Sequence, residues 1–153
     1  MKVHVPPVLI AAAGFEVQRR MTSRSHPVLR AAAIAVASAS AGLGAASVAT
    51  FAQQRTTVDP VRPQRASTLV TSGPFSVSRN PMYVAIVGVL AAHAFWRGRA
   101  EAFVPVVAVW AALDRLQIRP EESVLTGLFG ESYAQYAQAT PRWLGINRWP
   151  QHR

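Results

Sequence analysis

The feature that most constrains this chain is an uncharged stretch of 24 residues, Ala31 to Gln54, flanked by Arg30 and Arg55. An apolar stretch of about 18 residues or more is typical of a helix that spans a membrane. This one is rich in alanine, serine and glycine, and such small residues let helices approach closely within a bilayer. The sequence therefore predicts a membrane-spanning helix over about 28–52.

Three weaker apolar stretches support further helices: Val3–Phe15, Met82–Trp96 and Ala102–Leu113. The last two are separated by the polar segment Arg97–Glu101, which is typical of the tight turn of a helical hairpin. We therefore expect an all-α, polytopic membrane protein with about four transmembrane helices, forming a single domain over 1–153. The predicted helices cover about 4–19, 28–52, 81–96 and 100–117.

The composition favours a membrane over other partners of a basic protein. Charged residues make up only 15% of the chain, against about 25% in a soluble domain. The net charge is +9, but the arginines flank apolar stretches and form no single basic face, so we expect no nucleic-acid partner. Cysteine is absent and the four histidines are scattered, which predicts no disulfide and no metal site. A secretory signal over Met21–Ala49 is an alternative, although its cleavage would leave an apolar hairpin without partners.

The basic residues also predict an orientation. Ten of the sixteen lie in the N-terminus, the long middle connection and the C-terminal tail, and six lie on the opposite side. Because cytoplasmic segments carry more arginine and lysine, we expect both termini in the cytoplasm. Abundant arginine and alanine hint at a GC-rich bacterial genome, and thus at a multi-pass protein of the bacterial inner membrane.

Beyond Arg119 the pattern changes from apolar to amphipathic. Pro120 suits the first turn of a helix, and Glu121 and Glu122 suit its positive end. Apolar residues then recur at helical spacing, which predicts an amphipathic cytoplasmic helix over about 120–138.

Two short motifs resemble ligand-binding sequences, and one of them is better explained by helix packing. In Arg79-Asn80-Pro81-Met82-Tyr83, Asn80 is placed to cap a helix whose first residue is Pro81. A helix start beside an arginine and an amide can bind a carboxylate or phosphate. Gly42–Ser47 resembles a dinucleotide-binding loop, but it lies inside the predicted long helix, and close helix packing explains it better.

Taken together, the order of these pieces resembles the integral-membrane methyltransferases of the isoprenylcysteine carboxyl methyltransferase and phospholipid methyltransferase type. The resemblance covers most of the chain, and its most specific part spans some 85 residues. The matching elements are Pro6-Pro7, Thr56–Pro60, Leu69–Phe75, Arg79–Tyr83, a helical hairpin, Glu121-Glu122, Leu125, Phe129-Gly130, Tyr133, Tyr136 and Pro141-Arg142.

The resemblance implies S-adenosylmethionine as methyl donor and a site at the cytoplasmic ends of the last helices. Arg79, Asn80 and the helix start at Pro81 are then expected to hold the donor's carboxylate, and Tyr83 to pack against the donor. The donor's ammonium would pair with Glu121 or Glu122.

The same resemblance gives Arg142 and Glu122 as the expected catalytic residues, with Arg142 orienting an anionic acceptor. The acceptor would be a lipophilic small molecule, lipid or lipidated substrate that enters from the bilayer. Its reactive head would be a carboxylate, thiol or amine.

One position departs from the family's best-known motif, in which a histidine stands where this chain has Asn80. An amide forms hydrogen bonds but does not titrate near neutral pH, so a binding role survives and a proton-transfer role does not. Two alternatives stay open. One is an NADPH-dependent membrane reductase of similar architecture, and the other is a non-enzymatic membrane scaffold.

Overall fold

Prolines mark the first residue of three of the helices in the computed structural model, which describes residues 6–24, 26–54 and 68–145. Proline suits that position because its nitrogen has no hydrogen to leave unpaired and its φ is already helical. The described residues form helices and turns with no strand, which confirms the all-α prediction. The α-helices are α1 (Pro7–Arg20), α2 (Pro27–Gln53), α3 (Pro81–Arg97), α4 (Phe103–Leu113) and α5 (Arg119–Ala139).

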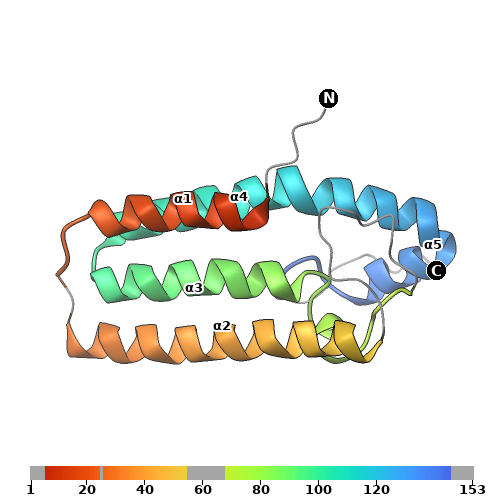
Figure 1. The fold of residues 1–153 in the computed structure, drawn as a ribbon, viewed down its shortest axis with the longest axis horizontal. Helices are drawn as coiled ribbons and strands as arrows, with labels where there is room; N and C mark the ends of the chain where they lie inside the picture. Colours follow the sequence, from red (N-terminus) through yellow and green to blue (C-terminus); the bar gives the residue numbers. More distant parts are fainter. Residues whose placement is uncertain (1–5, 25, 55–67, 146–153) are drawn as a thin grey trace.

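The first four helices run side by side, with α3 in contact with α1, α2 and α4 (Figure 1). The described residues of both short connections, 21–24 and 98–102, lie at one end of this bundle, which we call the turn end. They are joined there by a 2.8 Å hydrogen bond from the Arg24 N–H to the Arg97 carbonyl. Residues 68–80 and α5 lie at the opposite end, which we call the site end.

Small residues allow α2 and α3 to pack closely. A methyl group on Gly88 would collide with the hydroxyl of Ser40, and one on Gly44 would touch Ala85. Ser47 is fully buried in the same seam, where its hydroxyl donates to the carbonyl of Leu43 at 2.7 Å. Close helix packing therefore explains Gly44 and Ser47 of the segment 42–47, as expected, whereas a methyl group on Gly42 would meet no atom within 4 Å.

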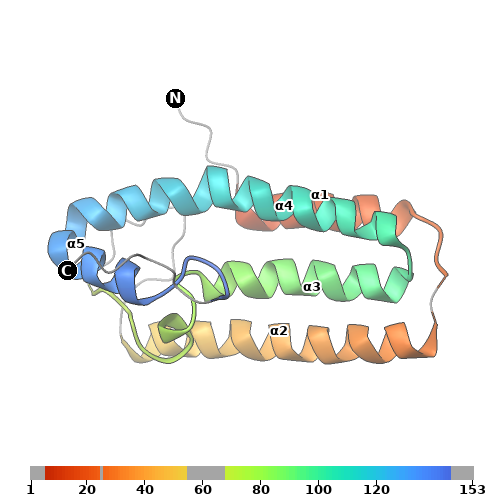
Figure 2. The same ribbon diagram turned by 180° about the vertical axis from the view of Figure 1, so that it is seen from behind.

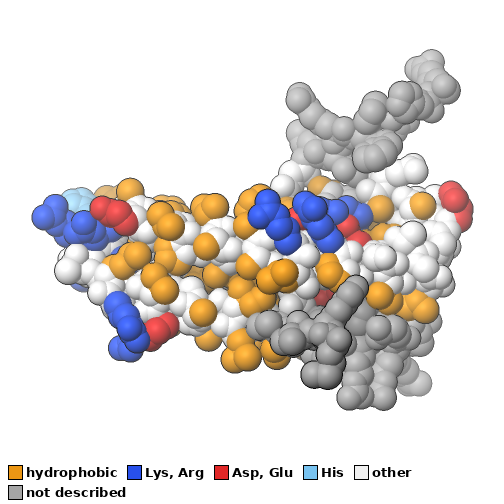
Figure 3. Space-filling view, turned by 90° about the horizontal axis from the view of Figure 1, so that it is seen from above, with side chains coloured by type: hydrophobic (Ala, Val, Ile, Leu, Met, Phe, Trp, Pro, Cys, Tyr) orange, Lys and Arg blue, Asp and Glu red, His pale blue; other side chains and the backbone are white. Residues whose placement is uncertain are grey.

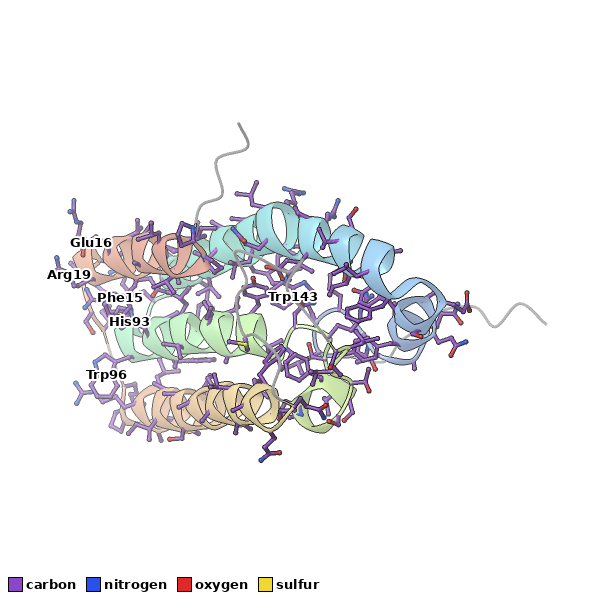
Figure 4. All side chains as sticks on the ribbon, turned by 45° about the vertical axis from the view of Figure 1, so that its right-hand side comes forward. Phe15, Glu16, Arg19, His93, Trp96 and Trp143 are labelled. Carbon is purple, nitrogen blue, oxygen red and sulfur yellow. The ribbon has the colours of Figure 1, made fainter. Side chains whose placement is uncertain are left out.

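A buried polar side chain ties α1 to its neighbours. Gln18 is fully buried, and its amide nitrogen donates to the carbonyls of Leu90 (3.1 Å) and Ala102 (2.8 Å). Its amide oxygen lies 2.9 Å from His93 Nδ1, and the His93 ring faces Phe15 across the α1–α3 contact (Figure 4). These bonds satisfy polar groups that would be costly to bury unpaired.

The predicted helix over 100–117 is wrong in its details. A 3₁₀ turn at Ala100–Ala102 precedes α4, and a π-helical turn at Asp114–Ile118 joins α4 to α5 without a break (Figure 2). Pro120 lies just beyond this turn inside the resulting rod, where its ring would clash with a carbonyl of a regular α-helix. The wider π turn gives the chain room at this point.

The amphipathic helix predicted over about 120–138 is not continuous either. Gly130 has φ 51° and ψ −122°, a conformation far from helical, and the chain reverses there. Only glycine adopts such a backbone without strain. The second half of α5 therefore returns toward the start of α3 (Figures 1 and 2).

One helix, α2, is long and apolar enough by itself to cross a membrane, while α3 is a shorter apolar helix. The described parts of the first four helices nevertheless expose large apolar side chains along the bundle, and Figure 3 shows such side chains over one of its faces. Examples are Val8 and Leu9 on α1, Val28 and Ile34 on α2, Val89 on α3, and Val104 and Val107 on α4.

Candidate functional site

The segment before α3 is joined to the C-terminal tail by backbone and side-chain hydrogen bonds. The Arg79 N–H donates to the Pro141 carbonyl at 2.8 Å. The Arg142 carbonyl accepts from both the Asn80 amide (3.0 Å) and the Ser78 hydroxyl (3.2 Å). Residues some 60 positions apart are thereby held together at the site end.

Asn80 stands at the N-cap position of α3, and Pro81 is the first helical residue, as the sequence predicts. The side chain of Asn80, however, does not cap the helix, because its amide is used to hold the tail. The Asn80 carbonyl still accepts the first helical bond, from the Val84 N–H at 3.0 Å. The amide at this position therefore connects the helix start to the tail.

Glu122 lies between two arginines that come from different parts of the chain. Arg142 donates to it from Nε (3.0 Å) and Nη2 (2.6 Å), and Arg79 Nη2 lies 3.2 Å away. The side chains of Glu122 and Arg79 are only 15% and 14% exposed. The Arg79 Nε is buried with no hydrogen-bond acceptor in the described part of the chain, so this guanidinium has a donor left to offer.

Asp114 joins the same network, and sequence reasoning missed it. Its carboxylate accepts from Arg119 Nε (3.0 Å), Arg142 Nη1 (3.3 Å) and Trp143 Nε1 (3.1 Å). Figure 4 shows Trp143 between the α4–α5 rod and the start of α3. The available signal was a single acid directly after the apolar stretch Ala102–Leu113.

The π turn explains why Asp114 and Glu122 share one arginine. In a regular α-helix, two residues eight apart point about 80° away from each other. A π turn accommodates one extra residue, so eight positions rotate the chain as seven do, and the difference falls to about 20°. Both carboxylates therefore face Arg142.

Glu121 has a different environment from Glu122. The Tyr83 hydroxyl donates to its Oε1 at 2.6 Å, and among the described residues no cation lies within ion-pair distance of it. Burial raises the pKa of Glu121 to about 7; the Tyr83 hydrogen bond opposes that shift, and the negative charge of Glu122 adds to it. This carboxyl therefore changes its charge near neutral pH.

Two tyrosines on the returning half of α5 complete this end. Tyr136 is buried, and its hydroxyl donates to the Phe75 carbonyl at 2.6 Å. Tyr133 packs edge-on against it, with ring centroids 6.2 Å apart. Burial raises the pKa of Tyr133 to about 12, so its hydroxyl stays neutral and can serve as a hydrogen-bond donor.

The structure thus brings all of the sequence-predicted site residues to one end of the bundle. These residues are Arg79, Asn80, Pro81, Tyr83, Glu121, Glu122 and Arg142. The matching segment Thr56–Pro60 lies outside the described residues. The functional roles expected of the predicted residues stay predictions.

Comparison with known proteins agrees with this arrangement. The phospholipid methyltransferase family matches residues 29–132, about two-thirds of the chain. The chain therefore belongs to the phospholipid methyltransferase family, which confirms the resemblance found in the sequence and supports methyltransferase activity.

The chain is also similar to the cobalt-zinc-cadmium resistance protein CzcN of Cupriavidus metallidurans, with 38% identity over 79 residues. The match covers 51% of this chain and 36% of that protein, so the chain spans only about a third of the relative's length. No solved structure matches the chain significantly.

Proposed function

We propose that the chain is a polytopic membrane enzyme that transfers the methyl group of S-adenosylmethionine to a lipophilic acceptor at the membrane interface. The observation that carries this proposal is the convergence of Arg79, Tyr83, Glu121, Glu122 and Arg142 at one end of an apolar bundle. Family membership supplies the reaction class, because phospholipid methyltransferases transfer methyl groups.

The charges of the site end fit a donor that carries both an ammonium and a carboxylate. Glu121 is the proposed partner of the ammonium, since Glu122 already binds two arginines. Arg79 is the proposed partner of the carboxylate, because its Nε has no acceptor among the described residues. The first N–H groups of α3 lie beside it and favour the same negative group.

Glu122 and Asp114 have a positioning role in this proposal. Together they fix the guanidinium of Arg142, which is then available to orient an anionic acceptor head. The bound donor supplies an electrophilic methyl group on a sulfonium. The chain's contribution is to hold donor and acceptor in line and to exclude water, which can supply much of a rate enhancement.

The exposed apolar side chains of the first four helices support a multi-pass arrangement with the site end at the interface. In such an arrangement an acceptor with an apolar tail reaches the site end from the bilayer. The proposed location is a bacterial inner membrane, with both termini in the cytoplasm. The acceptor's head remains a carboxylate, thiol or amine in this proposal.

Calorimetric titration of S-adenosylmethionine into the detergent-solubilised protein tests the donor site. We expect saturable binding by the parent and none by a folded Glu121→Gln/Glu122→Gln variant. The matched control is Glu16→Gln/Glu101→Gln, which removes the two glutamates of the turn end and should bind like the parent.

Two results would contradict the proposal. One is the absence of donor binding by a folded parent, and the other is undiminished binding by the Glu121/Glu122 variant. Saturable binding of NADPH in place of the donor would favour the reductase alternative. Binding of neither ligand would favour the scaffold.

A further inference from the structure

The turn end carries an excess of positive charge that the proposed reaction does not use. Six arginines and two glutamates gather there, leaving four positive charges. The arginines are Arg19 and Arg20 on α1, Arg24 in the first connection, Arg30 on α2, Arg97 on α3, and Arg99 in the second connection. In the proposed orientation this end faces away from the cytoplasm, where an arginine excess is unusual.

Both glutamates of this end are already paired locally. Glu16 accepts from Arg19 (2.8 Å) and Arg20 (2.7 Å), and Glu101 lies 3.2 Å from Arg99. Arg24 is exposed, and its guanidinium has no ion pair with the described residues. The arginines of this end therefore outnumber its glutamates, and both glutamates already have arginine partners.

Arg97 lies at the centre of this cluster. Its Nη2 donates to the Arg19 carbonyl at 3.0 Å, and its carbonyl accepts from the N–H of Arg24 at 2.8 Å. Its Nε is buried without an acceptor among the described residues. Arg97 has no ion pair among the described residues, so its guanidinium adds to the positive charge of this end.

The surface next to these charges is apolar and aromatic. The Arg30 guanidinium lies 5.3 Å from the ring centroid of Trp96, which is 42% exposed. Val28 is exposed beside Arg30 at the start of α2, and Ile34 and Val89 are exposed farther along α2 and α3. Figure 4 shows Trp96 at the same end as Glu16 and Arg19. Tryptophan with arginine above an apolar band is typical of the membrane interface.

We propose that the turn end binds the phosphate of an anionic glycerophospholipid, with Arg24 and Arg30 as the phosphate ligands. The acyl chains would lie along the exposed apolar side chains of α2 and α3. Guanidinium groups suit this role because they match the geometry of a phosphate and keep their charge. The inference rests on the membrane arrangement proposed above but not on methyl transfer.

Native mass spectrometry of the full chain in detergent tests this site. Phosphatidylglycerol and phosphatidylcholine of identical acyl composition serve as the probes. We expect the parent to retain phosphatidylglycerol at least tenfold better, since each basic residue near anionic lipid contributes a several-fold preference. The Arg24→Gln/Arg30→Gln variant should lose roughly tenfold or more of that retention.

Two control variants distinguish a specific lipid-binding site from non-specific electrostatic attraction. Arg24→Lys/Arg30→Lys keeps both charges and should retain most of the lipid. Arg115→Gln removes an exposed arginine beside the opposite end of α4 and should behave as the parent. Excess inorganic phosphate should leave the lipid bound, because it offers no acyl chains to the apolar surface.

Equal retention of the two lipids by the parent would overturn the proposal. So would parent-like retention by the folded Arg24→Gln/Arg30→Gln variant, an equal loss in Arg115→Gln, or displacement of the lipid by phosphate. Donor titration on the same samples keeps this outcome distinct from the methyltransferase proposal, because the two sites lie at opposite ends of the bundle.

Discussion

Glu122 and Arg142 form a two-pronged ion pair, with Nε and Nη2 of the arginine 3.0 and 2.6 Å from the two carboxylate oxygens. The two residues are 20 positions apart, and the chain reverses between them at Gly130. The pair therefore depends on that reversal, and it in turn fixes the tail against α5.

Removing the guanidinium of Arg142 should destabilise the protein. In Arg142→Gln, Asp114 and Glu122 lose a shared cation in a half-buried site, so we expect a loss of about 2 kcal/mol in the free energy of unfolding. Denaturant unfolding in detergent micelles measures it. Arg19→Gln is the control, because it breaks an exposed ion pair that solvent screens. Equal effects of the two changes would contradict the pairing.

Glu121 should make both stability and donor binding depend on pH. Its pKa is about 7 in the folded chain, above the ordinary value of 4.5, so the folded state binds more protons in this range. Its contribution to stability is therefore present below about pH 4.5 and lost as the pH rises through about 7. Donor affinity should change in the opposite sense and rise between pH 6 and 8, because only the carboxylate pairs with an ammonium.

The Glu121→Gln variant tests both statements. Thermal melts and donor titrations across this pH range should show a shallower dependence in the variant than in the parent. Parallel pH profiles of parent and variant would assign the titration to another group.

Alanine in place of Gly130 should destabilise the protein, whereas alanine in place of a nearby glycine should not. A side chain at Gly130 meets no atom within 4 Å, so Gly130→Ala costs only the strain of its positive φ, about 1–3 kcal/mol. Gly127 is also open to a methyl group but lies in regular helix, so Gly127→Ala should stabilise the protein by up to about 1 kcal/mol. Opposite signs in unfolding free energy are the expected result, and equal signs would contradict the chain reversal.

The amide of Asn80 should support donor binding indirectly, through the tail. Asn80→Ala removes the bond to the Arg142 carbonyl, and a loss of one hydrogen bond corresponds to roughly fivefold in affinity. Asn80→His restores the residue of the better-known motif and can donate to the same carbonyl, so we expect affinity close to that of the parent. Calorimetric titration of the donor measures both variants. Full affinity in Asn80→Ala would show that the tail bond is dispensable.

The elements that the sequence predicted well are those whose signal is local. The uncharged stretch Ala31–Gln54 predicted a helix over about 28–52, and α2 covers Pro27–Gln53. The sequence predicts binding residues in the Arg79–Tyr83 motif and in the Glu121-Glu122 pair, and the structure places these two motifs together. Each of these signals is carried by a few neighbouring residues.

What the sequence did not reveal depends on distant parts of the chain. Glycine is tolerated in helices, so Gly130 by itself does not indicate that the chain reverses there. Asp114 looked like the polar end of an apolar helix, because its partners Arg142 and Trp143 follow almost 30 residues later. Asn80 was expected to cap its own helix and instead holds the tail, which only the tertiary structure decides.

The π turn at Asp114–Ile118 has a consequence for reading related sequences. Because this turn absorbs one residue, the distance counted along the chain between two acids does not report which faces of the helix they occupy. In this chain Asp114 stands eight positions before Glu122. A homologue with a regular α-helix here should carry the equivalent of Asp114 only seven positions before the equivalent of Glu122, so that both carboxylates still face the equivalent of Arg142. An alignment with a gap of one residue at this point would then match the two acids, whereas an alignment without a gap would miss their equivalence.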